Sequence, residues 1–139
     1  MTRKYLITVA SLGLFSMVMV ILDVQFMIGA LTPEDQNFYD LATNVLLVHT
    51  VALFSMTFMN RYVSRSNLEI VYYFFSLGAV LFSVPLYLIA TEEVTNIVMG
   101  VFKPLSIFGG LGLLLGWLMV LYTGFTYKHK KHSIHNQSK

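Results

Sequence analysis

Four long apolar stretches, separated by short polar segments, dominate the pattern of hydrophobic and polar positions along the chain. The stretches run over about residues 5–31, 39–60, 68–90 and 105–127. At ~1.5 Å of rise per residue, about 20 apolar residues in a helix cross the ~30 Å hydrocarbon core of a bilayer. The pattern therefore predicts four membrane-spanning helices that form an all-α, antiparallel four-helix bundle.

The polar segments between the stretches contain residues that typically begin, bend or connect helices. Thr32 suits an N-cap and Pro33 suits a first helical position. The basic segment 61–67 is long enough only for a turn between antiparallel helices. Pro85 predicts a kink or an early end in the third helix. The apolar piece 97–102 is too short to cross the bilayer, so we expect it to be interfacial or re-entrant.

The first apolar stretch has two interpretations, a retained membrane helix or a signal peptide. The stretch is longer than the ~7–15 apolar residues of a signal core. In addition, Asp23 and Gln25 precede the small-residue pair at 29–30, where cleavage would have to occur. We therefore expect a retained helix.

Composition agrees with a membrane protein. Hydrophobic residues make up 56% of the 139 residues, charged residues only 12%, and the mean hydropathy is +0.68. Soluble domains carry about 25% charged residues. The length suffices for a single transmembrane domain, residues 1–127, followed by a basic tail, residues 128–139. The absence of cysteine excludes disulfides, thiolate metal sites and cysteine nucleophiles.

The distribution of charge predicts how the bundle is oriented. With four spans, both termini and the segment 61–67 lie on one side, and that side carries eight of the nine basic residues. The opposite side carries Lys103 and most of the acidic residues, namely Glu34, Asp35, Asp40, Glu92 and Glu93. By the positive-inside rule, both termini should face the cytoplasm, or the matrix in a mitochondrion. We expect the basic tail to contact anionic lipid, and we expect no nucleic-acid partner.

Polar residues inside the predicted spans form a candidate intramembrane site of Asp23, Gln25, Asn44 and His49. If the first span centres near Val18 and the second near His49, Asp23 and Asn44 each lie ~7.5 Å outward of the centre. We therefore expect Asp23 and Asn44 to meet, with Gln25 slightly further out. Asp23 has three interpretations: a hydrogen-bonded tie between two helices, a proton- or cation-coupling residue, or a group exposed at the interface.

His49 is expected near the middle of the membrane. It lies some 140° around the helix from Asn44, so the two need not share a site. The leading interpretation is a neutral histidine that is hydrogen-bonded between helices. Haem ligation by two histidines is not supported, because the other three are in the tail, and a metal site lacks further ligands. We therefore expect neither a metal nor a cofactor.

The fourth stretch is rich in glycine, which indicates close helix packing. Gly112 and Gly116 form a small-xxx-small pair, and Gly109 and Gly110 precede them. No nucleophile elbow, phosphate-binding loop, zinc-protease motif or convergent carboxylate pair is present in the sequence. We therefore expect a protein that is not an enzyme.

Three stretches resemble one known family. They read YDLATNVLLVHTVAL (39–53), LGAVLFSVPLYLIA (77–90) and KPLSIFGGLGLLLGW (103–117). In order and spacing these stretches are similar to the DUF423 family of small membrane proteins. The positions that match the family's patterns are Tyr39, Ala42, His49, Leu81, Phe82, Ser83, Leu86, Tyr87, Pro104, Gly109, Gly110, Gly116 and Trp117.

The chain also departs from the family's pattern. Asn44 stands where glutamine is usual, and Val84-Pro85 replaces a Gly-Ser pair. The segment LDVQFMIGAL (22–31) replaces a glycine-rich segment that ends in histidine. The resemblance implies a four-helix inner-membrane protein with cytoplasmic termini and implies no established activity.

Two functions from different classes follow from these observations. The leading hypothesis is a non-enzymatic accessory or structural subunit in the lipid bilayer, which packs against itself as a homo-oligomer or against a larger membrane complex. The alternative is a small proton- or cation-coupled transporter that uses Asp23. The expected location is a bacterial plasma membrane, with the mitochondrial inner membrane as the alternative.

Overall fold

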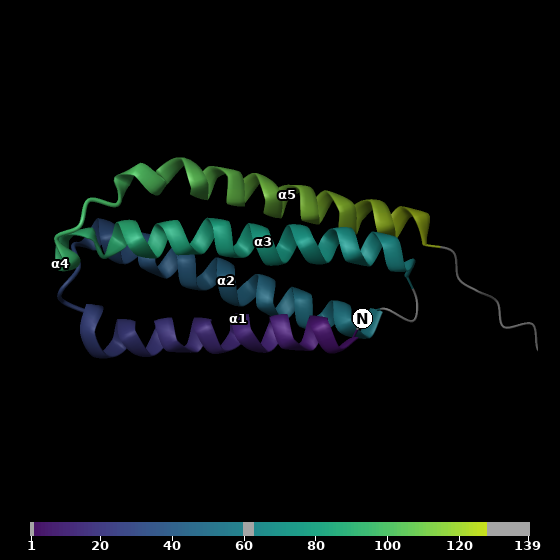
Figure 1. The fold of residues 1–139 in the computed structure, drawn as a ribbon, viewed down its shortest axis with the longest axis horizontal. Coiled ribbons are helices and arrows are strands. Elements are labelled where there is room, and N and C mark those ends of the chain that lie inside the picture. The colour runs from purple at the N-terminus through teal and green to yellow at the C-terminus, as the bar shows by residue number, and fades with distance from the viewer. Residues whose placement is uncertain (1, 60–62, 128–139) are drawn as a thin grey trace, which may run out of the picture.

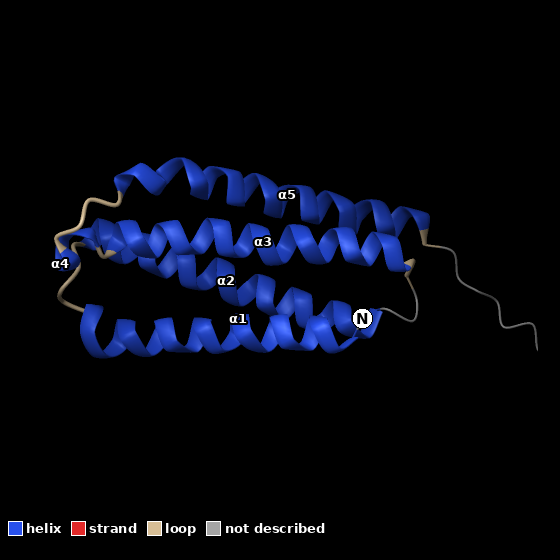
Figure 2. Ribbon diagram, in the orientation of Figure 1, coloured by secondary structure: helices blue, strands red, loops and turns tan. Residues whose placement is uncertain are grey.

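The computed structural model describes residues 2–59 and 63–127, and this part of the chain is helical, without strands (Figure 2). Helix α1 (Thr2–Leu22) continues into a π-helical turn, η1 (Asp23–Met27). Helices α2 (Pro33–Met59) and α3 (Arg65–Ala90) follow. The short helix α4 (Glu92–Thr95) and the 3-10 turn η2 (Gly100–Phe102) lead into helix α5 (Lys103–Thr126).

In the described part of the chain, four helical segments are long and apolar enough to cross a membrane. They are Arg3–Met27, Pro33–Met59, Arg65–Ala90 and Gly100–Thr126. The prediction of an all-α protein with four apolar spans is therefore confirmed. The predicted basic tail, residues 128–139, lies outside the described residues, as does part of the predicted turn at 61–67.

The four long helices run antiparallel to their neighbours in the chain (Figure 1). Helix α3 packs against α2 and α5, and α2 packs against both α1 and α3. The start of α1, the start of α3 and the end of α5 lie at the same end of the molecule, as an even number of spans requires. Which side of a membrane this end faces stays a prediction from the charges.

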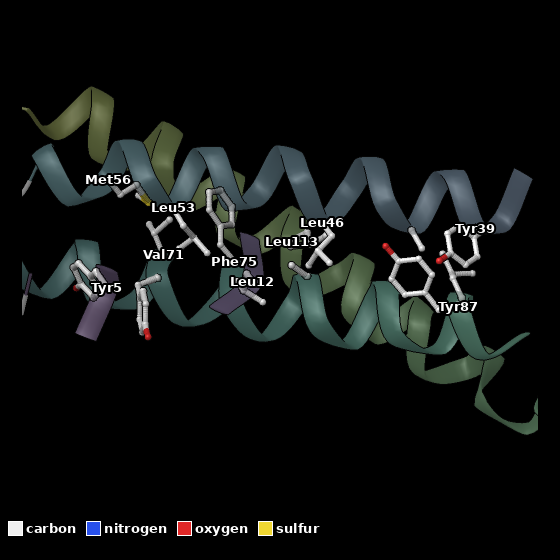
Figure 3. Packing of buried hydrophobic residues seen from close by; sticks show 14 of the residues in the cluster. Tyr5, Leu12, Tyr39, Leu46, Leu53, Met56, Val71, Phe75, Tyr87 and Leu113 are labelled. Atoms are coloured by element: carbon white, nitrogen blue, oxygen red, sulfur yellow. The ribbon is translucent and has the colours of Figure 1, made fainter. Parts of the chain in front are cut away.

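Helices α2 and α3 form the centre of the bundle. In the most apolar part of α2, 44% of the residues are buried, and in that of α3 50% are buried. The corresponding fractions are 22% in the first span and 17% in the last. Figure 3 shows the buried side chains along this centre, with Tyr39 and Tyr87 at one end and Tyr5 at the other. Because lipid is as apolar as these side chains, close packing and hydrogen bonds hold such helices together.

The helices extend beyond the apolar stretches that predicted them. Helix α2 begins at Pro33, before the apolar stretch 39–60, and the predicted N-cap Thr32 is confirmed: the Asp35 N–H donates to Thr32 Oγ1 (3.2 Å). Helix α3 begins at Arg65, where the Ser64 hydroxyl accepts from the Asn67 N–H (3.4 Å). The first helical segment is instead shorter than predicted, because it ends at Met27 and not at residue 31.

Two local predictions concern Pro85 and the segment 97–102. The early end predicted at Pro85 is wrong, because α3 continues to Ala90 with the proline inside it. Proline lacks the backbone N–H that would otherwise donate to the Leu81 carbonyl, so a kink at this position stays a prediction. The segment 97–102, which we expect to be interfacial or re-entrant, does not turn back into the bundle, and the interfacial alternative stays a prediction. It lies at one end of the molecule, between α4 and α5, with most of its apolar side chains exposed (Figure 1).

Candidate functional site

Asp23 belongs to a polar cluster at the end of the molecule opposite the N-terminus. The Gln36 side-chain Nε2 donates to Asp23 Oδ1 (2.9 Å) and to Asp40 Oδ1 (3.1 Å). The Gln36 amide therefore links the Asp23 carboxylate, at the end of the first span, to the Asp40 carboxylate in the second turn of α2. Gln36 was not among the predicted site residues, although its position one turn before Asp40 on a helix is a readable signal.

The backbone around Asp23 is a π-helical turn. The Ile28 N–H donates to the Asp23 carbonyl (3.0 Å), a bond between residues five apart. Such turns occur mostly as single insertions in helices and are frequent at functional sites. Here the turn begins at Asp23 itself, whereas Gln25, within the turn, is exposed.

The expected meeting of Asp23 and Asn44 is wrong. The Asn44 side chain is exposed on the outer face of α2, and none of the described residues hydrogen-bonds to its amide. Equal depth in the membrane does not set how a helix is turned about its axis. In the structure, Gln36 and not Asn44 reaches Asp23.

His49 is buried and ties α2 to α5. The Trp117 indole Nε1–H donates to His49 Nε2 (3.1 Å), and His49 Nδ1 lies 2.7 Å from the Val45 carbonyl oxygen. An indole nitrogen only donates. His49 Nε2 is therefore the acceptor, and the neutral ring carries its proton on Nδ1, where it donates to Val45. Both ring nitrogens have a partner.

The environment of His49 is aromatic. The ring stands edge-on to Phe75 of α3, with 5.2 Å between the ring centroids, and Phe75 lies 5.1 Å from the Trp117 ring. Only 7% of His49 is exposed. The histidine and the tryptophan therefore join three helices around one satisfied, neutral imidazole, and His49 does not share a site with Asp23 or Asn44.

Further polar side chains connect the helices in ways that the sequence does not indicate. Ser83 Oγ of α3 donates to the Ala42 carbonyl of α2 (2.9 Å) and is fully buried. The hydroxyls of Thr43 and Tyr87 share a hydrogen bond of 2.9 Å. The Thr43 hydroxyl also donates to the Tyr39 carbonyl of its own helix (3.0 Å), so Tyr87 is the group that gains its partner from the other helix. These bonds favour the packed arrangement of α2 and α3.

The glycines of α5 lie against α3. A Cβ atom at Gly109 would stand 2.5 Å from the Leu81 carbonyl carbon, and one at Gly116 would stand 2.5 Å from the Phe75 ring. Gly112 faces Gly78 of α3 at an ordinary contact distance, and Gly110 lies beside the Phe82 ring. The small-xxx-small pair therefore serves the packing of α5 on α3 within the chain.

The basic end of the molecule contains a second group of polar contacts. Lys4 Nζ donates to the Tyr73 hydroxyl (3.3 Å) and lies 5.5 Å from the centroid of the Tyr72 ring. Glu69 lies within 4.0 Å of Lys4 and 3.9 Å of Arg65. These contacts connect the starts of α1 and α3.

The described residues contain no group of three or more histidine, aspartate or glutamate side chains that could hold a metal ion. Gln36 holds two carboxylates at one end of the bundle, and Trp117 holds a neutral histidine inside it. Both sets of contacts connect helices.

The fold and these contacts define a small, all-helical, four-span membrane protein whose buried polar side chains link its helices. The chain matches the family described as "Protein of unknown function (DUF423)" over residues 25–110. Because the match covers more than half of the chain, the protein belongs to the DUF423 family. The matched region includes Gln36, Asn44 and His49, whereas Asp23 lies before it. The comparisons with curated proteins and with solved structures found no match.

Proposed function

We propose that this protein catalyses no reaction and acts as a packing subunit in the bilayer, which associates through its membrane-facing helices with itself or with a larger membrane complex. The observation that carries this proposal is Asn44. Its amide faces outward from α2, and no other residue in the described part of the chain hydrogen-bonds to it.

The depth of Asn44 makes the exposed amide significant. If the apolar stretch 39–60 is centred in the bilayer, Asn44 lies ~7.5 Å from the centre, inside the ~15 Å half-thickness of the hydrocarbon core. A polar group in hydrocarbon without a hydrogen-bond partner is unfavourable, and amide side chains in spans typically bond to neighbouring helices. The missing partner of Asn44 is therefore expected on another molecule.

Transport through Asp23 has weaker support. Proton-coupling carboxylates lie along a pathway through the spans. In this structure, Asp23 is held by Gln36 together with Asp40, close to the ends of α1 and α2. This arrangement favours the interpretation of Asp23 as a tie between two helices.

The location and orientation also belong to the proposal. The concentration of basic residues at the end that holds the N-terminus favours a cytoplasmic placement of that end. A bacterial plasma membrane is the leading location, and the mitochondrial inner membrane, with that end in the matrix, is the alternative.

The test is native mass spectrometry of the protein extracted gently from its own membranes, at its natural level of expression. We expect a fixed stoichiometry, either with a second copy or with other membrane proteins. The same extraction of an Asn44→Leu variant serves as the comparison. If the unmodified protein is released as a monomer, the proposal is refuted, and transport assays on Asp23 variants follow.

A further inference from the structure

We infer that the partner of Asn44 is the Asn44 of a second copy of this chain, and that two copies pack along the outer face of α2. This inference rests on the proposed function and specifies the surface and the partner. It follows from the spacing of the exposed residues on α2, from their chemistry, and from the symmetry that a membrane imposes on two identical chains.

Six of the exposed residues of α2 form a stripe with alternating steps of three and four residues, and Phe54 and Met59 are exposed beside it. We call these six residues the outer stripe: Leu41, Asn44, Val48, Val51, Ser55 and Phe58, all of which are exposed. This spacing is the seam of two helices that cross at a small angle. The opposite face of α2 has the same spacing and already packs on α1 and α3, through Tyr39, Ala42, Leu46, His49, Leu53 and Met56.

The chemistry of the outer stripe fits a helix better than it fits lipid alone. The stripe has no charged residue, and the Ser55 hydroxyl donates to the Val51 carbonyl of its own helix (3.0 Å), so it needs no further partner. Asn44 is the stripe residue whose polar group is left without a partner in the described structure. A matching stripe with an amide at the same level would supply one.

Membrane insertion brings the two amides to the same level. Two copies enter the bilayer with the same orientation, so their α2 helices run parallel and residue 44 has the same depth in both. A two-fold axis along the membrane normal then places each outer stripe against its copy. A carboxamide has both donors and an acceptor, so Asn44 is complementary to itself.

Cysteine crosslinking in membranes tests this interface, because the chain contains no cysteine of its own. Val48→Cys and Val51→Cys place one thiol on the stripe. Leu114→Cys and Leu118→Cys, on the exposed face of α5, are matched controls of similar exposure, 54% and 52% against 57% for Val48. A disulfide needs Cα atoms within about 7 Å. We expect oxidation to give a crosslinked dimer of the α2 variants and little of the α5 variants.

The Asn44 amide is tested by its effect on affinity. Dimer affinity is measured by energy transfer between labelled copies reconstituted in phosphatidylcholine vesicles. Asn44→Leu should weaken the dimer roughly tenfold or more, as expected for the loss of two inter-helix hydrogen bonds. Asn44→Gln keeps the amide and should retain most of the affinity. Because Asn44 is exposed, neither substitution should alter the fold of the single chain, which circular dichroism checks.

The outcomes separate the inference from the proposed function. Equal crosslinking from α2 and α5, or unchanged affinity of Asn44→Leu, overturns the inference. If the Val48 and Val51 thiols crosslink to a different protein and native mass spectrometry shows a mixed complex, the second copy is wrong and the packing function stands. A monomer in native mass spectrometry, with no crosslink from α2, overturns both.

Discussion

The packing of α5 on α3 predicts that Gly109→Ala destabilises the protein. An alanine Cβ at this position would lie 2.5 Å from the Leu81 carbonyl carbon and 2.7 Å from the Phe82 Cα. Ordinary van der Waals contact begins at 3.4 Å, so the Cβ atom would lie about 0.9 Å too close to the Leu81 carbonyl carbon. Both atoms are backbone and cannot rotate away, so α5 must shift as a whole.

The free-energy change has two opposing parts. Overpacking of this kind costs about 1–3 kcal/mol, and the rigid backbone places Gly109 at the upper end. Replacing glycine by alanine in a helix contributes about 1 kcal/mol in the opposite direction. We therefore expect Gly109→Ala to lower the free energy of unfolding by about 2 kcal/mol.

Two glycines of the same helix serve as controls. A Cβ at Gly112 would meet the Gly78 Cα at 3.6 Å, and one at Gly124 would meet nothing within 4 Å. Alanine at either position keeps the helix contacts and gains helix propensity, so both variants should be as stable as the natural protein or slightly more stable. Comparison of the three alanine variants therefore distinguishes an effect of close helix packing at Gly109 from a general effect of replacing glycine in this helix.

The assay is unfolding in detergent micelles, by titration with sodium dodecyl sulfate and by heating, followed by circular dichroism. Gly109→Ala should unfold at a lower fraction of denaturing detergent, whereas Gly112→Ala and Gly124→Ala should not. If Gly109→Ala is as stable as the natural protein, or if all three variants lose stability equally, the packing argument is refuted.

Three further substitutions test the polar contacts in the same assay. Trp117→Phe leaves His49 Nε2 buried without a donor, so the free energy of unfolding should fall by about 1–3 kcal/mol; an unchanged value would show that this bond contributes nothing. Asp23→Asn keeps an oxygen that can accept from Gln36 and should cost less than about 1 kcal/mol, whereas a loss of pH-linked transport in this variant would favour the transport alternative. Ser83→Ala removes a bond to the α2 backbone and should lower the free energy of unfolding by about 1 kcal/mol. A variant as stable as the natural protein would contradict this prediction.

The candidate site was predicted in part. The sequence identified Asp23, Asn44 and His49 as polar residues inside the spans, because a polar residue in an apolar stretch is visible without a structure. Their partners were not predictable in this way. Asp23 bonds to Gln36, which precedes the expected start of the second span, and His49 bonds to Trp117 on a helix 68 residues later.

The sequence by itself determined the class of protein and the number of its spans. Each span must be predominantly apolar, whatever surrounds it, because hydrocarbon offers no partner to charges or to backbone groups. Hydropathy therefore counts spans without knowledge of their packing, and the four apolar helices confirm the count.

The tertiary structure alone decided how each helix is turned about its axis. Most faces of these helices are apolar, so the pattern of polar positions does not distinguish the face toward lipid from the face toward protein. The contacts that do so are close approaches and hydrogen bonds between helices, such as Gly109 against Leu81 and Ser83 with Ala42. On α2, the bonds from Ser83 to Ala42 and from Trp117 to His49 accompany the orientation that places His49 inward and Asn44 outward.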